Sequence, residues 1–63
     1  MGDVARSIMD AIGTVESVGG GLEMEIEETP GQNTPANRLK LKQLMKIDEL
    51  LEKAMKLAER QGL

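Results

Sequence analysis

The 63-residue sequence contains no cysteine, no histidine and no aromatic residue. The missing cysteines exclude a disulfide, and the lack of both Cys and His excludes a zinc site built on those ligands. Aromatic side chains bury about 150–250 Å² each, so a core without them depends on Leu, Ile, Val, Met and Ala. Because chains of this size bury only about 60% of their unfolded surface, we expect partner contacts to supply the missing support.

Long apolar runs are also missing. No segment reaches the length of about 20 apolar residues that spans a bilayer. No basic cluster precedes an apolar stretch near the first residue, so no signal peptide is predicted. Arg6 stands where a myristoylation motif starting at Gly2 requires Ser or Thr. We therefore expect the protein to be cytoplasmic, or to lie within a particle that assembles inside the cell.

The charges are divided unevenly along the chain. Residues 1–37 hold seven acids and one base, a net charge of −6, whereas residues 38–63 hold seven bases and four acids, a net charge of +3. The run from Arg38 to Lys46 contains four bases and no acid. Such asymmetry is typical of a basic tail that binds nucleic acid. It is equally consistent with an acidic half that lies near the basic half, in the same chain or in a neighbouring one.

Residues 3–18 have the pattern of a short helix. Asp3 is a suitable N-cap, because its carboxylate can accept an amide proton from the first turn. The apolar stripe recurs at spacings of four and three and contains Val4, Ile8, Ala11, Val15 and Val18. We predict that Gly19, Gly20 and Gly21 end this helix and act as a hinge.

Residues 22–28 alternate apolar and acidic side chains, which is the period of a β-strand. We interpret them as a short acidic strand. A loop or a frayed helix is the alternative, because Glu and Met favour helix over strand. Residues 29–34 then form a turn-rich linker, in which Pro30 and Gly31 suit a type II turn.

Residues 35–61 are predicted to form one long amphipathic helix. Thr34 is a suitable cap, Pro35 fits the first helical position, and Gly62 is a typical stop signal. Glu49 with Lys53 and Glu52 with Lys56 have the spacing of i,i+4 ion pairs.

The apolar face of the long helix covers nearly half of its circumference, so we expect it to contact two neighbours. The 16-residue first helix covers little more than half of its length, and the hairpin then has unequal arms. Exposed apolar surface of this kind marks interaction sites. The predicted partner-binding residues are Leu22, Met24, Ile26, Leu41, Leu44, Ile47, Leu51, Met55 and Ala58.

A single strand leaves its backbone N–H and C=O groups unpaired on both edges. It can pair with its own copy across a two-fold axis, or add to the sheet edge of a different protein. The third reading is an acidic ribbon that extends over a basic surface of its own or an adjacent chain. Most of these arrangements require another molecule.

The residues that carry chemistry do not form a recognisable catalytic pattern. Ser7, Thr14 and Ser17 have no histidine to activate them, and no phosphate-binding P-loop occurs. The glutamates of residues 23–28 lie on alternating faces, which does not gather ligands for Ca²⁺ or Mg²⁺. We predict no enzymatic activity, no cofactor, no metal site and no small-molecule substrate.

Nucleic-acid and membrane binding are also not expected. Leu39, Leu41 and Leu44 interrupt the basic run, and there is no aromatic side chain on which a base would stack. The first helix carries a single base, Arg6, which is too little for a helix that lies on an anionic membrane.

The sequence therefore favours a mainly α single domain over residues 1–63 that is completed by oligomerisation or by docking. The function we expect is that of a small, non-enzymatic structural or assembly protein. It would pack an amphipathic helix and an extended acidic segment against copies of itself or a larger particle, of which a bacteriophage virion is one example. The alternative is a regulatory adaptor that docks a helix or strand on one target protein.

Overall fold

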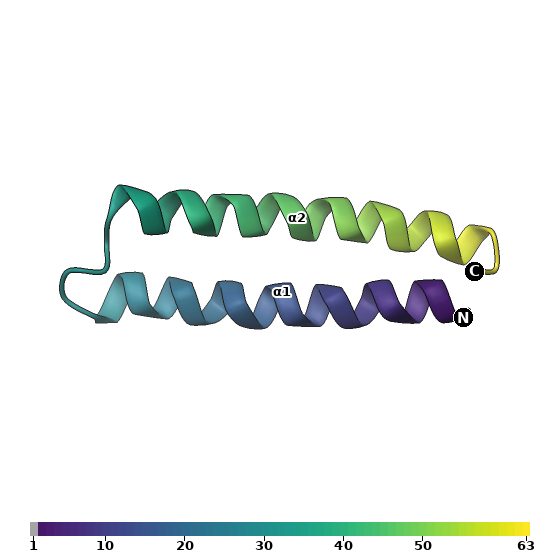
Figure 1. Ribbon diagram of the computed structural model, residues 1–63, viewed down its shortest axis with the longest axis horizontal. Coiled ribbons are helices and arrows are strands. Elements are labelled where there is room, and N and C mark those ends of the chain that lie inside the picture. The colour runs from purple at the N-terminus through teal and green to yellow at the C-terminus, as the bar shows by residue number, and fades with distance from the viewer. Residues whose placement is uncertain (1) are drawn as a thin grey trace.

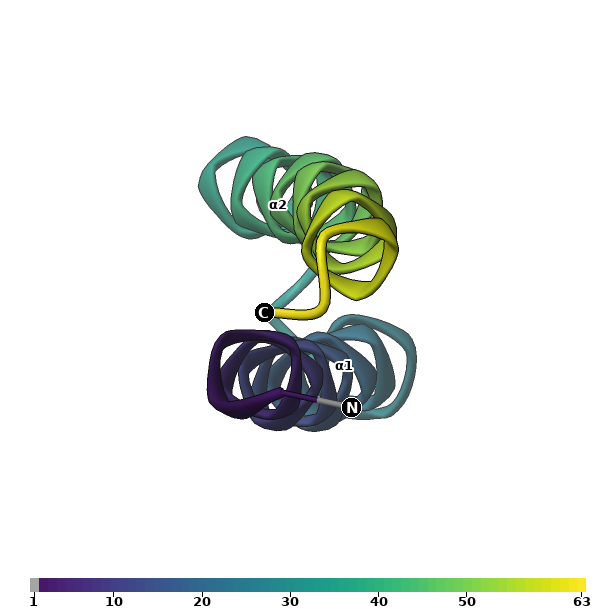
Figure 2. The same cartoon turned by 90° about the vertical axis from the view of Figure 1, so that its right-hand side faces the viewer.

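The computed structural model of the protein describes residues 2–63 and consists of two antiparallel helices. Helix α1 (Asp3–Glu28) and helix α2 (Pro35–Arg60) lie side by side, and the linker joins them at one end of a rod that measures 46 × 15 × 10 Å (Figure 1). The view along the rod shows the two helices as a single layer, with the last residues of the chain returning toward the start of α1 (Figure 2).

One seam holds the two helices together. The side chains that each helix turns inward alternate at spacings of three and four residues, which is the heptad rhythm of a coiled coil. These buried or half-buried seam positions are Ala5, Ile8, Ile12, Val15, Gly19, Leu22 and Ile26 in α1, and Asn37, Leu41, Leu44, Asp48, Leu51, Met55 and Ala58 in α2.

The antiparallel order sets the register of the seam. The ends of the two helices place positions whose numbers sum to about 63 at the same height along the rod. Gly19 and Leu44, which have this relation, line the same hollow. Within residues 2–63 the buried apolar residues are Ala5, Ile12 and Ala58. Two helices in one layer therefore enclose only a thin core.

The predicted glycine hinge and acidic strand are both wrong. Helix α1 continues without interruption through Gly19–Gly21 and residues 22–28, and residues 2–63 include no strand. Leu22 and Ile26 are four residues apart and continue the seam, while Met24 points outward and is 60% exposed. Leu, Glu and Met are good helix formers, and packing against α2 offsets the loss of about 1 kcal/mol per glycine relative to alanine.

The prediction of unequal arms is also wrong, for the same reason. Each helix has 26 residues, so α1 covers α2 along its whole length. The structure confirms the coarser expectation of a mainly helical protein. The apolar surface of α2 that α1 leaves uncovered therefore depends on the width of that surface around the helix and not on the length of either helix.

The start of α1 differs from the expected Asp3 cap. Gly2 occupies the N-cap position, and no side chain caps the helix. The backbone oxygen of Leu63 accepts hydrogen bonds from the amides of Val4 (3.0 Å) and Ala5 (3.2 Å) instead. These amides are among the first-turn donors that lack an intrahelical partner, so residues at opposite ends of the sequence are joined by backbone hydrogen bonds.

Helix α2 begins at the predicted residue and ends at Arg60, one residue before the predicted end. Thr34 Oγ1 accepts a hydrogen bond from the amide of Asn37 at 3.1 Å, and Pro35 is the first helical residue. After Arg60 the chain forms a Schellman motif, with Gly62 at φ 70° and the Leu63 amide donating to the Ala58 oxygen at 2.9 Å.

The linker also has the expected turn. Gly31 has φ 84°, and the amide of Gln32 donates to the oxygen of Thr29, as in a type II turn around Pro30 and Gly31. The Asn37 side chain donates to the backbone oxygen of Gln32 at 2.7 Å, which ties the turn to the first turn of α2.

Candidate protein-interaction surface

The seam divides the outside of the hairpin into two long flanks with different chemistry. One flank, called here the acidic flank, carries Glu16, Glu23, Glu52 and Glu59, together with Met9 and Met45. The other, called the apolar flank, carries Val4, Ala11 and Val18 from α1 and Ile47, Leu50, Ala54 and Leu57 from α2. Each set follows from helix periodicity, because residues seven apart return to the same side of a helix.

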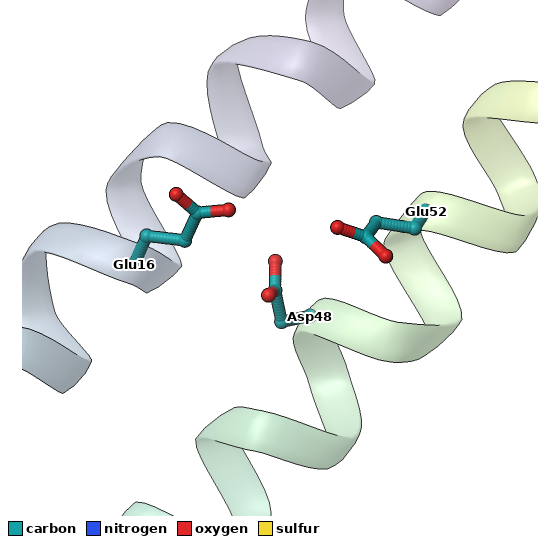
Figure 3. Close-up of side chains that lie close together, drawn as sticks. All are labelled: Glu16, Asp48 and Glu52. Carbon is teal, nitrogen blue, oxygen red and sulfur yellow. The ribbon is translucent and has the colours of Figure 1, made fainter.

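Three carboxylates converge on the acidic flank. Glu16 projects from α1, and Asp48 and Glu52 project from successive turns of α2 toward it (Figure 3). One carboxylate oxygen from each lies within 4.8 Å of the other two. The expected Glu52–Lys56 ion pair is not formed, whereas Glu49 does pair with Lys53 at 3.8 Å. The Glu52 carboxylate lies in the acidic cluster instead.

Asp48 is the member of this cluster that the fold constrains most. It is the one acidic residue at a seam position, and its Oδ1 atom is buried without a hydrogen-bond partner. A buried polar atom that loses water without gaining a partner destabilises the folded state. Glu16 and Glu52 are exposed and can turn into water, so the cluster is a local concentration of like charge.

The linings of two shallow hollows show which residues share the apolar flank. Val18, Gly21 and Glu25 of α1 line the same hollow as Lys40 of α2. Ile47 and Ala54 lie seven and fourteen residues beyond Lys40, so they are on the same side of α2. The second hollow is lined by Val4, Ser7 and Ala11 with Leu51 beneath them.

The two helices contribute side chains of different size to the apolar flank. Helix α2 presents a ridge of Ile47, Leu50 and Leu57, which are 43%, 52% and 55% exposed. Helix α1 presents small residues there: Ser7 and Gly21 line the two hollows, and Thr14 lies midway between them on the same side of the helix. The surface is therefore ridged on one helix and hollowed on the other.

The opposite charges of the helices are not matched inside the hairpin. Over residues 2–63 the ion pairs are Lys46–Glu49 and Lys53–Glu49, both at 3.8 Å and both within α2. Helix α1 has seven acids and one base, and helix α2 has seven bases and four acids. Asp3 and Asp10 lie on the outer face of α1, opposite the seam, and Lys46, Lys53 and Arg60 lie on the outer face of α2.

The solvent-accessible area of the hairpin is large for its mass. It amounts to 4714 Å² for a chain of 6.9 kDa. A compact monomer of this mass exposes about 4,000 Å², so the hairpin exposes about 700 Å² more. Each partner in a standard protein interface contributes about 800 Å², which is close to this excess.

The predicted partner-binding residues fall into two groups. Leu22, Ile26, Leu41, Leu44, Leu51, Met55 and Ala58 lie at the seam, where they are half-buried or buried within the chain. Met24 and Ile47 remain exposed. The sequence analysis missed Leu50, Leu57, Val4 and Val18 as candidates, although their spacing in multiples of seven residues was present in the sequence.

No protein-family model matches the chain, and no curated protein or solved structure is significantly similar to it. Neither of the two helices is long and apolar enough over residues 2–63 to cross a membrane.

Proposed function

We propose that the protein is a non-enzymatic assembly protein that packs its apolar flank against a protein surface, in copies of itself or on a larger particle. The apolar flank is the observation that supports this proposal. It places Val4, Val18, Ile47, Leu50 and Leu57 on one side of a thin hairpin, each of them 43% exposed or more. Contiguous apolar surface of this kind is typical of interaction sites.

The surface area supports the same proposal. The excess of about 700 Å² over a compact monomer is close to the area, about 800 Å², that one partner loses in a standard interface. The thin core supports it too, because small scaffolds without disulfides or metals are usually stabilised by partner contacts.

Site-specific photo-crosslinking in the native cells tests the proposal. A photoreactive residue replaces Leu50 on the apolar flank, and the matched control replaces Met45, which is 68% exposed on the acidic flank. We expect irradiation to produce covalent protein adducts at position 50 and far fewer adducts at position 45. Equal yields at the two positions, or no adduct at position 50, would overturn the proposal.

A further inference from the structure

We propose that the partner of the apolar flank is a second copy of this chain, and that the two hairpins form a four-helix bundle. The two-fold axis of the pair runs along the length of the hairpin, so that α1 of each copy packs on α2 of the other. This inference rests on the proposed function and names its partner. Three independent properties of the flank favour this arrangement.

The first property is the position of the apolar flank along the rod. In the seam register Leu57 lies at the height of residue 6, and Ile47 at the height of residue 16. Most of the apolar side chains therefore occupy the half of the hairpin away from the linker. Val18 and Ile47 lie near its middle, and Glu25 and Lys40 occupy the half near the linker. A two-fold axis along the rod superimposes the two apolar halves, whereas an axis across the rod sets each apolar half against a polar one.

The second property is the match in size between the helices. With the axis along the rod, Leu57 of one copy faces Val4 and Ser7 of the other, and Leu50 faces Ala11 and Thr14 at nearly the same height. The large side chains of α2 thus meet the hollows and small side chains of α1. Ridges that fit into grooves are the usual basis of helix packing.

The third property is charge. The proposed pairing sets α1, with seven acids and one base, beside α2, with seven bases and four acids, and it brings Glu25 of one copy to Lys40 of the other. The alternative axis sets acidic α1 on acidic α1. Complementary charge selects the orientation of an interface, and like charges oppose the wrong one.

Sedimentation equilibrium of the purified full chain tests whether the pair forms. We expect a monomer–dimer equilibrium. The double substitution of Ile47 and Leu50 by Gln should raise the dissociation constant at least about 100-fold, because four partly buried apolar side chains are lost per dimer. The matched control replaces Met9 and Met45 by Gln on the acidic flank and should change the dissociation constant by less than about threefold.

Two results would overturn the dimer. One is a folded monomer at all concentrations up to about 1 mM, the upper end of measurable weak association. The other is a dimer that the acidic-flank control disrupts as strongly as the apolar-flank variant. Far-UV circular dichroism establishes that each variant keeps its helices. If the adducts at position 50 in cells contain only a different protein, the proposed function stands and the dimer is removed.

Disulfide trapping tests the orientation of the two copies in the dimer. Because the chain has no native cysteine, each single variant carries only the introduced thiol. Val18→Cys and Ile47→Cys are prepared as separate single variants and then oxidised alone and as a mixture. A disulfide requires Cα atoms within about 7 Å, and the proposed axis brings position 18 of one copy to position 47 of the other. We expect cross-linked dimers mainly in the mixture. Efficient cross-linking of Val18→Cys with itself would contradict the arrangement.

Discussion

Asp48→Leu is expected to stabilise the hairpin, although it alters the most constrained member of the acidic cluster. Asp48 stands at a seam position where the neighbouring seam residues of α2, Leu44 and Leu51, are apolar. Its Oδ1 atom is buried and has no hydrogen-bond partner. Leucine fills the same position without a polar atom, so the seam becomes apolar from Leu41 to Ala58.

The magnitude follows from three contributions. Removing a buried polar atom without a partner recovers about 1–3 kcal/mol. The better helix propensity of Leu adds a few tenths of a kcal/mol, about 0.4. Relief from the carboxylates of Glu16 and Glu52 adds about 0–1 kcal/mol, since both are exposed and screened by water. We expect the free energy of unfolding to rise by about 2–3 kcal/mol, which raises Tm by about 10–20 °C for a chain of this size.

Thermal and urea unfolding, followed by far-UV circular dichroism at one fixed protein concentration, provide the measurement, since association shifts apparent stability. Asp48→Asn serves as the control, because it removes the charge and keeps a polar group in the seam. We expect a smaller gain for Asn than for Leu. If Asp48→Leu lowers the free energy of unfolding, or leaves it unchanged, the description of Asp48 as an unsatisfied seam residue is refuted.

Three further substitutions test the local structure through the same unfolding measurements. Gly13→Ala should stabilise α1 by about 1 kcal/mol, because no atom lies within 4 Å of the added Cβ; a loss of stability would show that this part of α1 is not helical. Gly62→Ala should destabilise the protein by about 1–2 kcal/mol, since φ is 70° there, and an unchanged urea midpoint would argue against the Schellman motif. Thr34→Ala should cost about 1 kcal/mol by removing the acceptor of the Asn37 amide, and faster hydrogen exchange of that amide is expected with it.

The second helix was predictable because its signals are local. Thr34, Pro35 and Gly62 act through their own backbone geometry and through hydrogen bonds to residues three to five positions away. Such interactions do not depend on how the rest of the chain folds. The linker turn at Pro30 and Gly31 was predictable for the same reason.

The second half of α1 was not predictable in this way, because its local signals conflict. Three glycines disfavour helix. The alternation of Leu22, Met24 and Ile26 with glutamates is the pattern of a strand, but the spacing of four between Leu22 and Ile26 equally fits a helix that contacts α2 at those two positions. Packing against Leu41 and Leu44 decides the conflict in favour of helix. The acidic cluster was missed because Glu16 is 32 positions from Asp48 in the sequence, and only the hairpin brings them together.

The sequence by itself determined that the protein is mainly helical, where α2 begins, and that its core contains no aromatic side chain. Those properties depend on composition and on contacts within a few residues. Only the tertiary structure decided the length of α1, the pairing of the seam, and the separation of an acidic flank from an apolar one. These depend on which faces of two distant segments meet, and the physical reason is that burying an apolar stripe stabilises a helix only where a partner helix covers it.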